Sequence, residues 1–251
     1  MKKLVIYTVL TGNYDNLRQP ESIVDDFDYI CFSNDITKQR IGIWEIRSFD
    51  YHNNNNTRES RFPKLNPHLV LSEYEYSLYI DAKIRIDDSV NIRAAELINN
   101  DCQLAMIPHP MRDCVYQEAM TLTCSKIGEP ELVYKQTRFL LKEKFPAGKG
   151  LFDCAVIFRK HNNTPVAVFS KTWWEIYCSY SSRDQMSVTY ALYKAGLSPE
   201  IFLPASFYRN HVFEHLKKRK NFSELSFISK ILLYLNILRM RLLYKVHGLK
   251  Y

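Results

Sequence analysis

The 251 residues are enough for one large domain, or one domain with an appendage, and 46% apolar with 24% charged residues indicates a globular chain. None of the seven glycines forms a G-x-G-x-x-G, Walker or G-x-S-x-G pattern, so the dinucleotide-binding, P-loop and serine-hydrolase classes have no motif support. The net charge of +7 lies entirely in residues 212–251, where nine Lys/Arg accompany two acids, while residues 1–211 are neutral. A neutral body argues against nucleic acid as the partner.

The chain begins on a predicted strand and then alternates between strands and helices. Residues 4–9 are an apolar, β-branched run that ends at Thr11-Gly12, with no small-residue cleavage site of a signal peptide. Further strands are predicted at 29–32, 43–46, 76–80, 103–107, 155–159 and 201–203, and helices from a Thr57 cap and at 88–98, 115–124, 129–143, 164–180 and 184–195. This alternation predicts one α/β domain over residues 1–211 with a mostly parallel central sheet flanked by helices, followed by a tail over 212–251.

The tail combines charge with apolar periodicity. A basic cluster at 217–220 precedes residues 222–246, in which apolar side chains recur every three or four residues. The strong apolar run is too short to span a bilayer, so a basic amphipathic helix lying on an anionic membrane surface through 217–246 is predicted. The alternative is a helix docked on the core of the domain. The six scattered cysteines form no C-x-x-C pair and indicate a reduced, cytoplasmic protein. Together with the tail, this predicts a protein that is peripheral on the inner face of the cell membrane.

In parallel sheets, ligands bind at the carboxyl ends of the strands, which makes the segments after each strand the site candidates. Asp81 directly follows a buried strand, where a carboxylate suits a metal or a sugar hydroxyl; the structural alternative is a turn or cap. A D-x-D metal site would need an acid at position 83, where Lys83 stands. An ammonium does not bind Mg²⁺ or Mn²⁺, but it neutralises phosphate directly.

Three cations, Arg58, Arg61 and Lys64, follow one another at three-residue steps along one side of a predicted helix. Such a face suits a diphosphate through charge-assisted hydrogen bonds. The alternative is a solvated surface face.

A second polar segment, 181–185, lies between two predicted helices and fits either helix capping or recognition of sugar hydroxyls. His109, His161 and His211 each follow or end an apolar run. A lone histidine is usually structural, but three of them favour at least one in the site.

Several ordered segments over residues 4–211 together resemble a glycosyltransferase-like family that was once a domain of unknown function. This family includes plant proteins of pectin mucilage galactosylation and bacterial proteins of surface-polysaccharide loci. The segments that carry the resemblance are Ile6–Asp15 (IYTVLTGNYD), Ile30–Asp35 (ICFSND), Arg58-x-x-Arg61-x-x-Lys64 with Pro67-His68, Tyr79–Lys83 (YIDAK), His109-Pro110-x-Arg112 with Glu118, Arg159-x-His161-Asn162, and Ser182–Ser187 (SRDQMS).

The resemblance implies a GT-A-type domain that uses a nucleotide sugar, and it implies roles for single residues. The nucleotide sugar would contact Thr8, Leu10, Gly12, Tyr14, Asp35, Arg58, Arg61, Lys64 and Lys83. The sugar or acceptor would contact His109, Arg112, His161, Arg183 and Gln185. Asp184 and Asp81 would be catalytic, with Asp184 positioning or deprotonating the acceptor, and Asp81 and His211 would bind a metal if there is one. Mn²⁺ or Mg²⁺ stays open as a cofactor, because Lys83 replaces the second acid of D-x-D.

The resulting hypothesis is a hexosyltransferase that moves sugar from a nucleotide diphosphate donor, expected to be UDP-linked, to a growing cell-surface polysaccharide or lipid-linked glycan such as a capsule or lipopolysaccharide. The alternatives are a non-catalytic nucleotide-sugar or glycan binding module at the membrane surface and, ranked lower, a lipid amidohydrolase.

Overall fold

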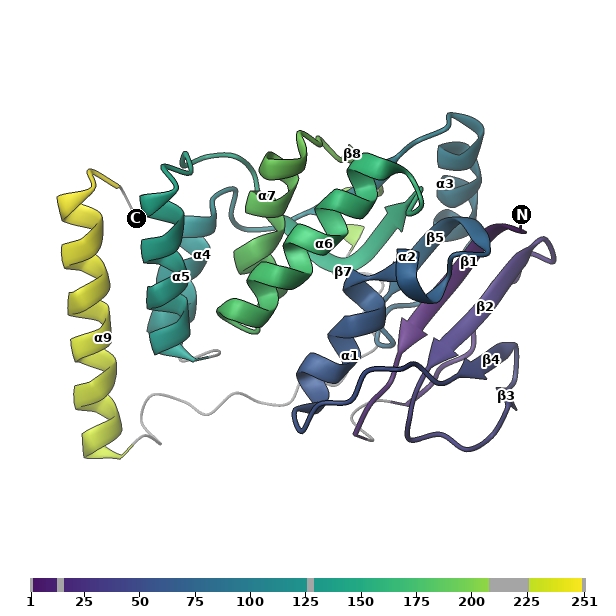
Figure 1. The fold of residues 1–251 in the computed structure, drawn as a ribbon, viewed down its shortest axis with the longest axis horizontal. Coiled ribbons are helices and arrows are strands. Elements are labelled where there is room, and N and C mark those ends of the chain that lie inside the picture. The colour runs from purple at the N-terminus through teal and green to yellow at the C-terminus, as the bar shows by residue number, and fades with distance from the viewer. Residues whose placement is uncertain (1, 13–15, 126–128, 208–225, 250–251) are drawn as a thin grey trace.

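The computed structural model describes residues 2–12, 16–125, 129–207 and 226–249. The described strands form one eight-stranded sheet in the order β3-β4-β2-β1-β5-β7-β6-β8. Its strands are β1 Lys2–Val9, β2 Phe27–Phe32, β3 Arg40–Ile41, β4 Trp44–Arg47, β5 Tyr74–Ile80, β6 Leu104–Pro108, β7 Phe152–Arg159 and β8 Glu200–Ile201. Helices cover the sheet (Figure 1), so the predicted α/β class is confirmed.

The centre of the sheet is parallel and buried on both faces. β1 pairs in parallel with β2 and β5, and β2 pairs in parallel with β4. Ile6 and Tyr7 are both fully buried, although they point to opposite faces. A strand covered on both sides needs a continuous apolar run, which is the pattern seen in the sequence of β1.

β7 runs against its neighbours. It pairs antiparallel with both β5 and β6, and the hairpin strand β3 pairs antiparallel with β4. β1, β2, β4, β5 and β6 therefore end at one end of the sheet, here called the carboxyl end, where β7 begins. β7 finishes at the opposite, amino end. The expectation that the residues after every strand share one end of the sheet is wrong for β7 and hence for His161.

The helices pack on both faces and at one end of the sheet. α1 Asn56–Leu65, α6 Thr164–Ser179 and α7 Asp184–Ala195 bury apolar side chains on the Tyr7 face, and α3 Asp88–Asn99 buries its own on the Ile6 face. α2 Pro67–Val70 follows α1 directly. The cap of α1 is Asn55, whose side chain accepts from the N–H groups of Thr57 and Arg58, rather than the predicted Thr57.

A third apolar cluster lies beyond the end of the sheet. It joins α4 Val115–Ser125 and α5 Pro130–Lys142 to α9 Phe227–Val246, the outermost helix in Figure 1. Tyr244 of α9 donates a hydrogen bond to the carbonyl of Tyr116 at 2.6 Å, and Met240 is buried beside it. One face of the predicted tail helix is thus docked on the domain. Among the described residues, no helix combines the length and hydropathy needed to cross a bilayer.

Candidate active site

An ion-paired network at the carboxyl end of the sheet joins α1, β5 and α7. The Asp184 carboxylate, at the start of α7, accepts from Arg61 Nε at 2.9 Å and from Lys64 Nζ at 2.5 Å. Lys64 Nζ also lies 3.6 Å from Asp81 Oδ1, directly after β5. The fold therefore brings two α1 cations and two aspartates that are distant in sequence into one cluster, of which Asp81 alone was expected there from the strand ends.

Burial differs sharply within this network. The side chains of Lys64 and Asp184 are 2% and 6% exposed, whereas those of Arg61 and Asp81 are 25% and 23% exposed. Lys64 is also held over the Tyr79 ring, 4.7 Å from its centroid. Lys64 and Asp184 thus form the buried base of the site, and Arg61 and Asp81 form its accessible surface. The α1 cations are not a solvated face, and the predicted direct contact of Lys64 with a diphosphate does not fit its burial.

Asp184 is poorly suited to take a proton. Burial opposes its ionisation, but Arg61 and Lys64 outweigh burial and hold the pKa of Asp184 far below its usual range. A general base works best with a pKa near the working pH, so this shift runs in the wrong direction. The geometry favours positioning of Arg61 and Lys64 over the predicted role as acceptor base.

The loop before α7 fixes Asp184. Gln136 of α5 is fully buried, accepts from Ser181 N–H at 3.2 Å and donates to the Met186 carbonyl at 3.1 Å. Arg183 and Gln185, on either side of Asp184, are only partly buried, and Arg183 Nε is a buried donor without a hydrogen-bond partner among the described residues.

The surroundings of Asp81 do not fit a divalent metal. Its Oδ1 accepts from Tyr79 Oη at 2.6 Å and faces Lys64, while its Oδ2 lies 3.6 Å from Lys83 Nζ. Burial opposes ionisation, but Lys64 and Lys83 lower the pKa of Asp81. Two ammonium groups thus occupy the space beside this carboxylate. Within the described residues, no three His, Cys, Asp or Glu side chains gather as a ligand set; the predicted ligand His211 lies outside the described residues.

The turn after β1 is held by a hydrogen bond to Asp35 and by close packing against α1. Gly12 has a positive φ of 66°, and its N–H donates to Asp35 Oδ2 at 2.6 Å. A Cβ at this position would lie 2.1 Å from Asn56 Nδ2 of α1, so a larger residue would have to displace that side chain as well as adopt the positive φ that favours glycine. Asp35 and Gly12 therefore shape the loop, and Leu10 is buried below it. Tyr14 lies outside the described residues.

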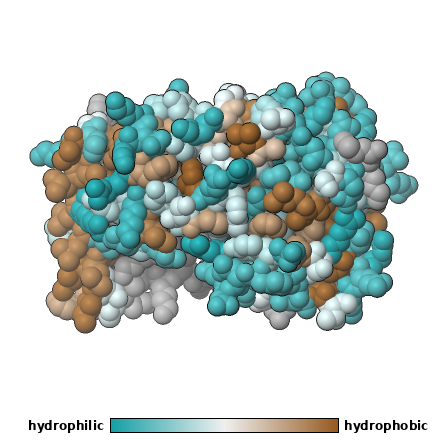
Figure 2. Space-filling model, in the orientation of Figure 1, coloured by the Kyte–Doolittle hydropathy of each residue, from teal (hydrophilic) through white to brown (hydrophobic). Residues whose placement is uncertain are grey.

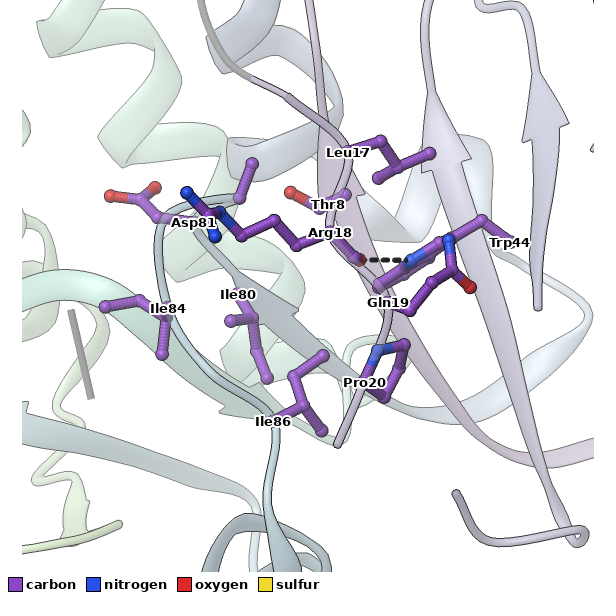
Figure 3. Close-up of a pocket in the computed structure, with 11 residues that line it drawn as sticks. Thr8, Leu17, Arg18, Gln19, Pro20, Trp44, Ile80, Asp81, Ile84 and Ile86 are labelled. Atoms are coloured by element: carbon purple, nitrogen blue, oxygen red, sulfur yellow. Dashed lines mark hydrogen bonds between the residues drawn. The ribbon is translucent and has the colours of Figure 1, made fainter. Parts of the chain in front are cut away.

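Two hollows flank this turn. Thr8, Asp81 and Arg18 line a small recess with about 10 Å³ of free space, room for about one water molecule. Figure 3 shows the Arg18 side chain extending toward Asp81, and Thr8 Oγ1 is buried there without a hydrogen-bond partner among the described residues. The second hollow is an open groove of about 740 Å³ after β2 and β4, lined by Asn34, Phe49 and His52 among others.

A separate cluster follows β6 at the same end of the sheet. Arg112 Nε donates to the buried Glu118 carboxylate at 2.6 Å, and Arg112 Nη2 lies 3.2 Å from His109 Nε2. Burial and the Arg112 charge lower the pKa of His109. The predicted sugar or acceptor residues His109 and Arg112 are thus together, although no contact joins them to Asp81 or Asp184 among the described residues.

His161 lies elsewhere, at the amino end of the sheet. It is fully buried, and its Nε2 bonds the Leu71 carbonyl at 2.8 Å. Burial lowers its pKa to about 4. The antiparallel direction of β7 carries this histidine away from Asp81, so the structure does not support the predicted sugar contact.

Arg58 is also engaged within the fold. Its Nη1 donates to the Cys178 carbonyl of α6 at 3.1 Å. Of the three α1 cations that were predicted to bind a diphosphate, Arg61 is the network member whose side chain stays partly exposed. Lys83, beside Asp81, adds a second accessible cation, with a side chain that is 35% exposed.

The sequence of residues 1–222 matches the family described as TOD1/MUCI70, glycosyltransferase-like domain. The chain belongs to this family. The matched residues include every member of the ion-paired network, and membership of this family identifies the chain as a glycosyltransferase. It also confirms the resemblance drawn from the ordered sequence segments.

Other comparisons add little detail to the family assignment. A search among curated proteins finds no match. Among solved structures, the chain is similar to the apo structure of the bifunctional glycosyltransferase WbbM, with 12% identity and a TM-score of 0.43 over 95% of this chain and 44% of that one. The chain thus spans less than half the length of WbbM.

Two residues at the carboxyl end of the sheet were not predicted from the sequence. Arg18 follows the β1 turn in a segment without periodicity, so nothing in the sequence indicated that it lines the recess with Asp81. Asp153 lies at the start of β7, which was predicted to begin at residue 155 and to run parallel. Had β7 been predicted as antiparallel, its first residues would have been placed at the carboxyl end of the sheet.

Proposed function

We propose that this family member transfers a hexosyl unit from a nucleotide diphosphate sugar, with UDP as the expected nucleotide, to a cell-surface polysaccharide or lipid-linked glycan. The observation that carries the proposal is the network of Arg61, Lys64 and Lys83 around Asp81 and Asp184. Three cations against two carboxylates leave an excess of positive charge where a diphosphate leaving group would develop negative charge.

Each part of the carboxyl end has a role in this proposal. Arg61 and Lys83, both partly exposed, contact the diphosphate, and Lys64 and Asp184 hold Arg61 and Asp81 in place. The groove after β2 and β4 has the volume of a small-molecule site and takes the nucleoside. His109 and Arg112 face the acceptor. No divalent ion is part of this scheme, because Lys64 and Lys83 supply the charge beside Asp81.

The test is donor binding and turnover on the full chain. Calorimetry with UDP and a panel of UDP-hexoses should give binding, and UDP should be released slowly with water as acceptor. Release should persist in EDTA. Binding without any release of UDP would instead favour a non-catalytic binding module. The absence of both for UDP-, GDP- and dTDP-sugars would refute the transferase proposal.

A second part of the proposal concerns the membrane. The face of α9 that points away from α4 exposes large apolar side chains (Figure 2): Phe227, Ile228, Ile231, Leu232, Tyr234, Leu235, Leu238, Leu242 and Val246. The helix carries four Lys/Arg and no acid. An apolar face with cationic flanks fits the interface of an anionic bilayer, and the basic cluster at 217–220, outside the described residues, adds to that charge. We infer peripheral attachment to the inner face of the cell membrane, close to a lipid-linked acceptor.

Vesicle sedimentation tests this attachment. The full chain should bind vesicles of phosphatidylcholine with phosphatidylglycerol, and Ile231→Ser with Leu235→Ser should weaken binding at least tenfold. Both side chains are exposed, so thermal stability should change little. Unchanged vesicle binding of this variant would contradict the inference. A wild-type dimer that the same substitutions dissociate would assign the face to a second copy instead.

A further inference from the structure

The carboxyl end of the sheet holds one more carboxylate, at the start of β7. Asp153 lies two residues before Ala155, whose carbonyl accepts the Asp81 N–H at 2.8 Å. On the other side it pairs with Ile107 of β6, and the neighbouring Leu151 carbonyl accepts from His109 N–H at 2.9 Å. Asp153 therefore sits between the Asp81 network and the His109–Arg112 cluster.

An irregularity in the sheet sets the position of Asp153. Pairing between β6 and β7 jumps from Met106 with Ile157 to Ile107 with Asp153, so three residues of β7 lie between consecutive pairs. Bulges of this kind bend a strand and re-aim its side chains, and they are frequent next to active sites. Here the bulge falls where the strand reaches the carboxyl end of the sheet.

The Asp153 carboxylate is less engaged than the other two. Asp184 is held by Arg61 and Lys64, and Asp81 by Lys64, Lys83 and Tyr79. In the part of the chain that the structure describes, Asp153 Oδ1 accepts one hydrogen bond, from Ala155 N–H at 2.8 Å, and no cation lies within ion-pair distance of it. Burial, with the charge of Asp81 acting in the same direction, raises the pKa of Asp153, while Lys83 and Lys64 oppose this shift.

We propose that Asp153 is the catalytic base that deprotonates the acceptor hydroxyl, a role that rests on the proposed transferase function. The acceptor O–H proton passes to the Asp153 carboxylate as the acceptor oxygen bonds to C1 of the sugar. The bond from C1 to the diphosphate oxygen breaks, and its electron pair leaves with the nucleoside diphosphate beside Arg61 and Lys83. Asp153 then releases the proton to water. A single displacement of this kind inverts the configuration at C1.

The experiment compares Asp153→Asn with the wild type, using the UDP-hexose that the wild type hydrolyses fastest and water as acceptor. We expect kcat for UDP release to fall at least a hundredfold, in line with the loss of general base catalysis, while the KM for the donor and the Kd for UDP change less than threefold. Asp153→Glu, which keeps a carboxylate, should retain more activity than Asp153→Asn. Asp26→Asn is the matched control, because Asp26 is exposed at the amino end of the sheet, before β2. It should behave as wild type.

Three results would overturn the assignment: UDP release by Asp153→Asn within threefold of wild type, loss of UDP binding as large as the loss of turnover, or a hexose first released with the donor's own anomeric configuration in NMR spectra. These outcomes differ from failure of the proposed function, in which the wild type itself would neither bind nor cleave any donor. A melting temperature of Asp153→Asn within a few degrees of wild type, and full UDP binding, would exclude misfolding as the cause of lost turnover.

Discussion

At the carboxyl end of the sheet, buried charged side chains contact each other, whereas at the amino end the ion pair between Lys160 and Asp101 is exposed to solvent and other polar side chains contact the backbone. Lys64 bridges Asp81 and Asp184 at the first end. At the second, His161 bonds the Leu71 carbonyl, and Asn162 Nδ2 donates to the carbonyls of Ser72 and Tyr74 at 3.0 and 2.9 Å. Ion-paired side chains thus form the proposed ligand site at one end, and a histidine and an asparagine anchor a turn at the other.

A buried cation connects the two ends. Arg159 is fully buried in β7 and donates to Tyr7 Oη at 2.7 Å and to the Lys64 carbonyl at 2.6 Å. Burial lowers the pKa of this guanidinium, which is a cost that the fold carries to fix the end of α1. The comparison indicates that substitutions at the carboxyl end should affect function, or function with stability, while those at the amino end should affect stability alone.

The largest effect is expected from Asp184→Ala, which leaves Lys64 buried without its nearest anion. Breaking a buried ion pair from one side costs about 3–5 kcal/mol of unfolding free energy. Transfer should be lost as well, because Arg61 and Lys64 lose their common partner. Urea denaturation and UDP release measure the two losses.

A paired substitution separates these losses. Asp184→Leu combined with Lys64→Met removes both buried charges, and apolar replacements of buried pairs are often neutral. Stability should return toward wild type while transfer stays absent. If Asp184→Ala alone were as stable as wild type, the buried network would not hold the fold.

The next effect concerns His161 and pH. Its pKa is about 4 in the folded protein and about 6.5 in the unfolded chain, so the unfolded chain binds the extra proton between these values. The contribution of His161 to the free energy of unfolding is therefore fully present above pH 6.5 and is lost as the pH falls. At pH 4.5 the loss from this group alone is about 2–3 kcal/mol. Denaturation curves at pH 7 and 4.5 should show a smaller drop for His161→Gln than for wild type. Equal drops would mean that His161 does not titrate as its burial requires.

A smaller effect is expected from Lys83→Ala, which removes a partly exposed cation beside Asp81. A hydrogen bond to a charged group contributes about 1.5–3 kcal/mol, so the Kd for UDP should rise roughly tenfold or more. The fold should be unaffected. Lys171→Ala, on the exposed side of α6, is the control with the same charge change. Equal UDP affinity in both variants would remove Lys83 from the donor site.

The sequence predicted the location of strands and helices well, because local patterns determine it. It predicted the direction of strands poorly, because pairing between distant strands determines that. The apolar runs and caps located nearly every described strand and helix within a few residues, and Asp81, Arg61, Lys64 and Asp184 did meet. The direction of β7 depends on its place between β5 and β6, which no local pattern of β7 encodes. This one strand moved His161 out of the site and left Asp153 unnoticed. The burial of Lys64 could not be predicted either, because the spacing of the α1 cations does not show that Lys64 faces α7.

The smallest expected effect is Asn162→Ala, at the amino end of the sheet. The substitution leaves the carbonyls of Ser72 and Tyr74 without their shared donor, and a hydrogen bond of this kind contributes about 1 kcal/mol because water replaces part of it at this exposed position. The midpoint of urea denaturation should fall slightly, while the Kd for UDP and the rate of UDP release stay at wild-type values. A stability loss with unchanged function is what an anchoring residue predicts, since β7 keeps its Arg159 contacts and its position at the site. A change in UDP release without a change in stability would show that the two ends of the sheet are coupled through β7. Effects on function would then no longer be confined to the carboxyl end.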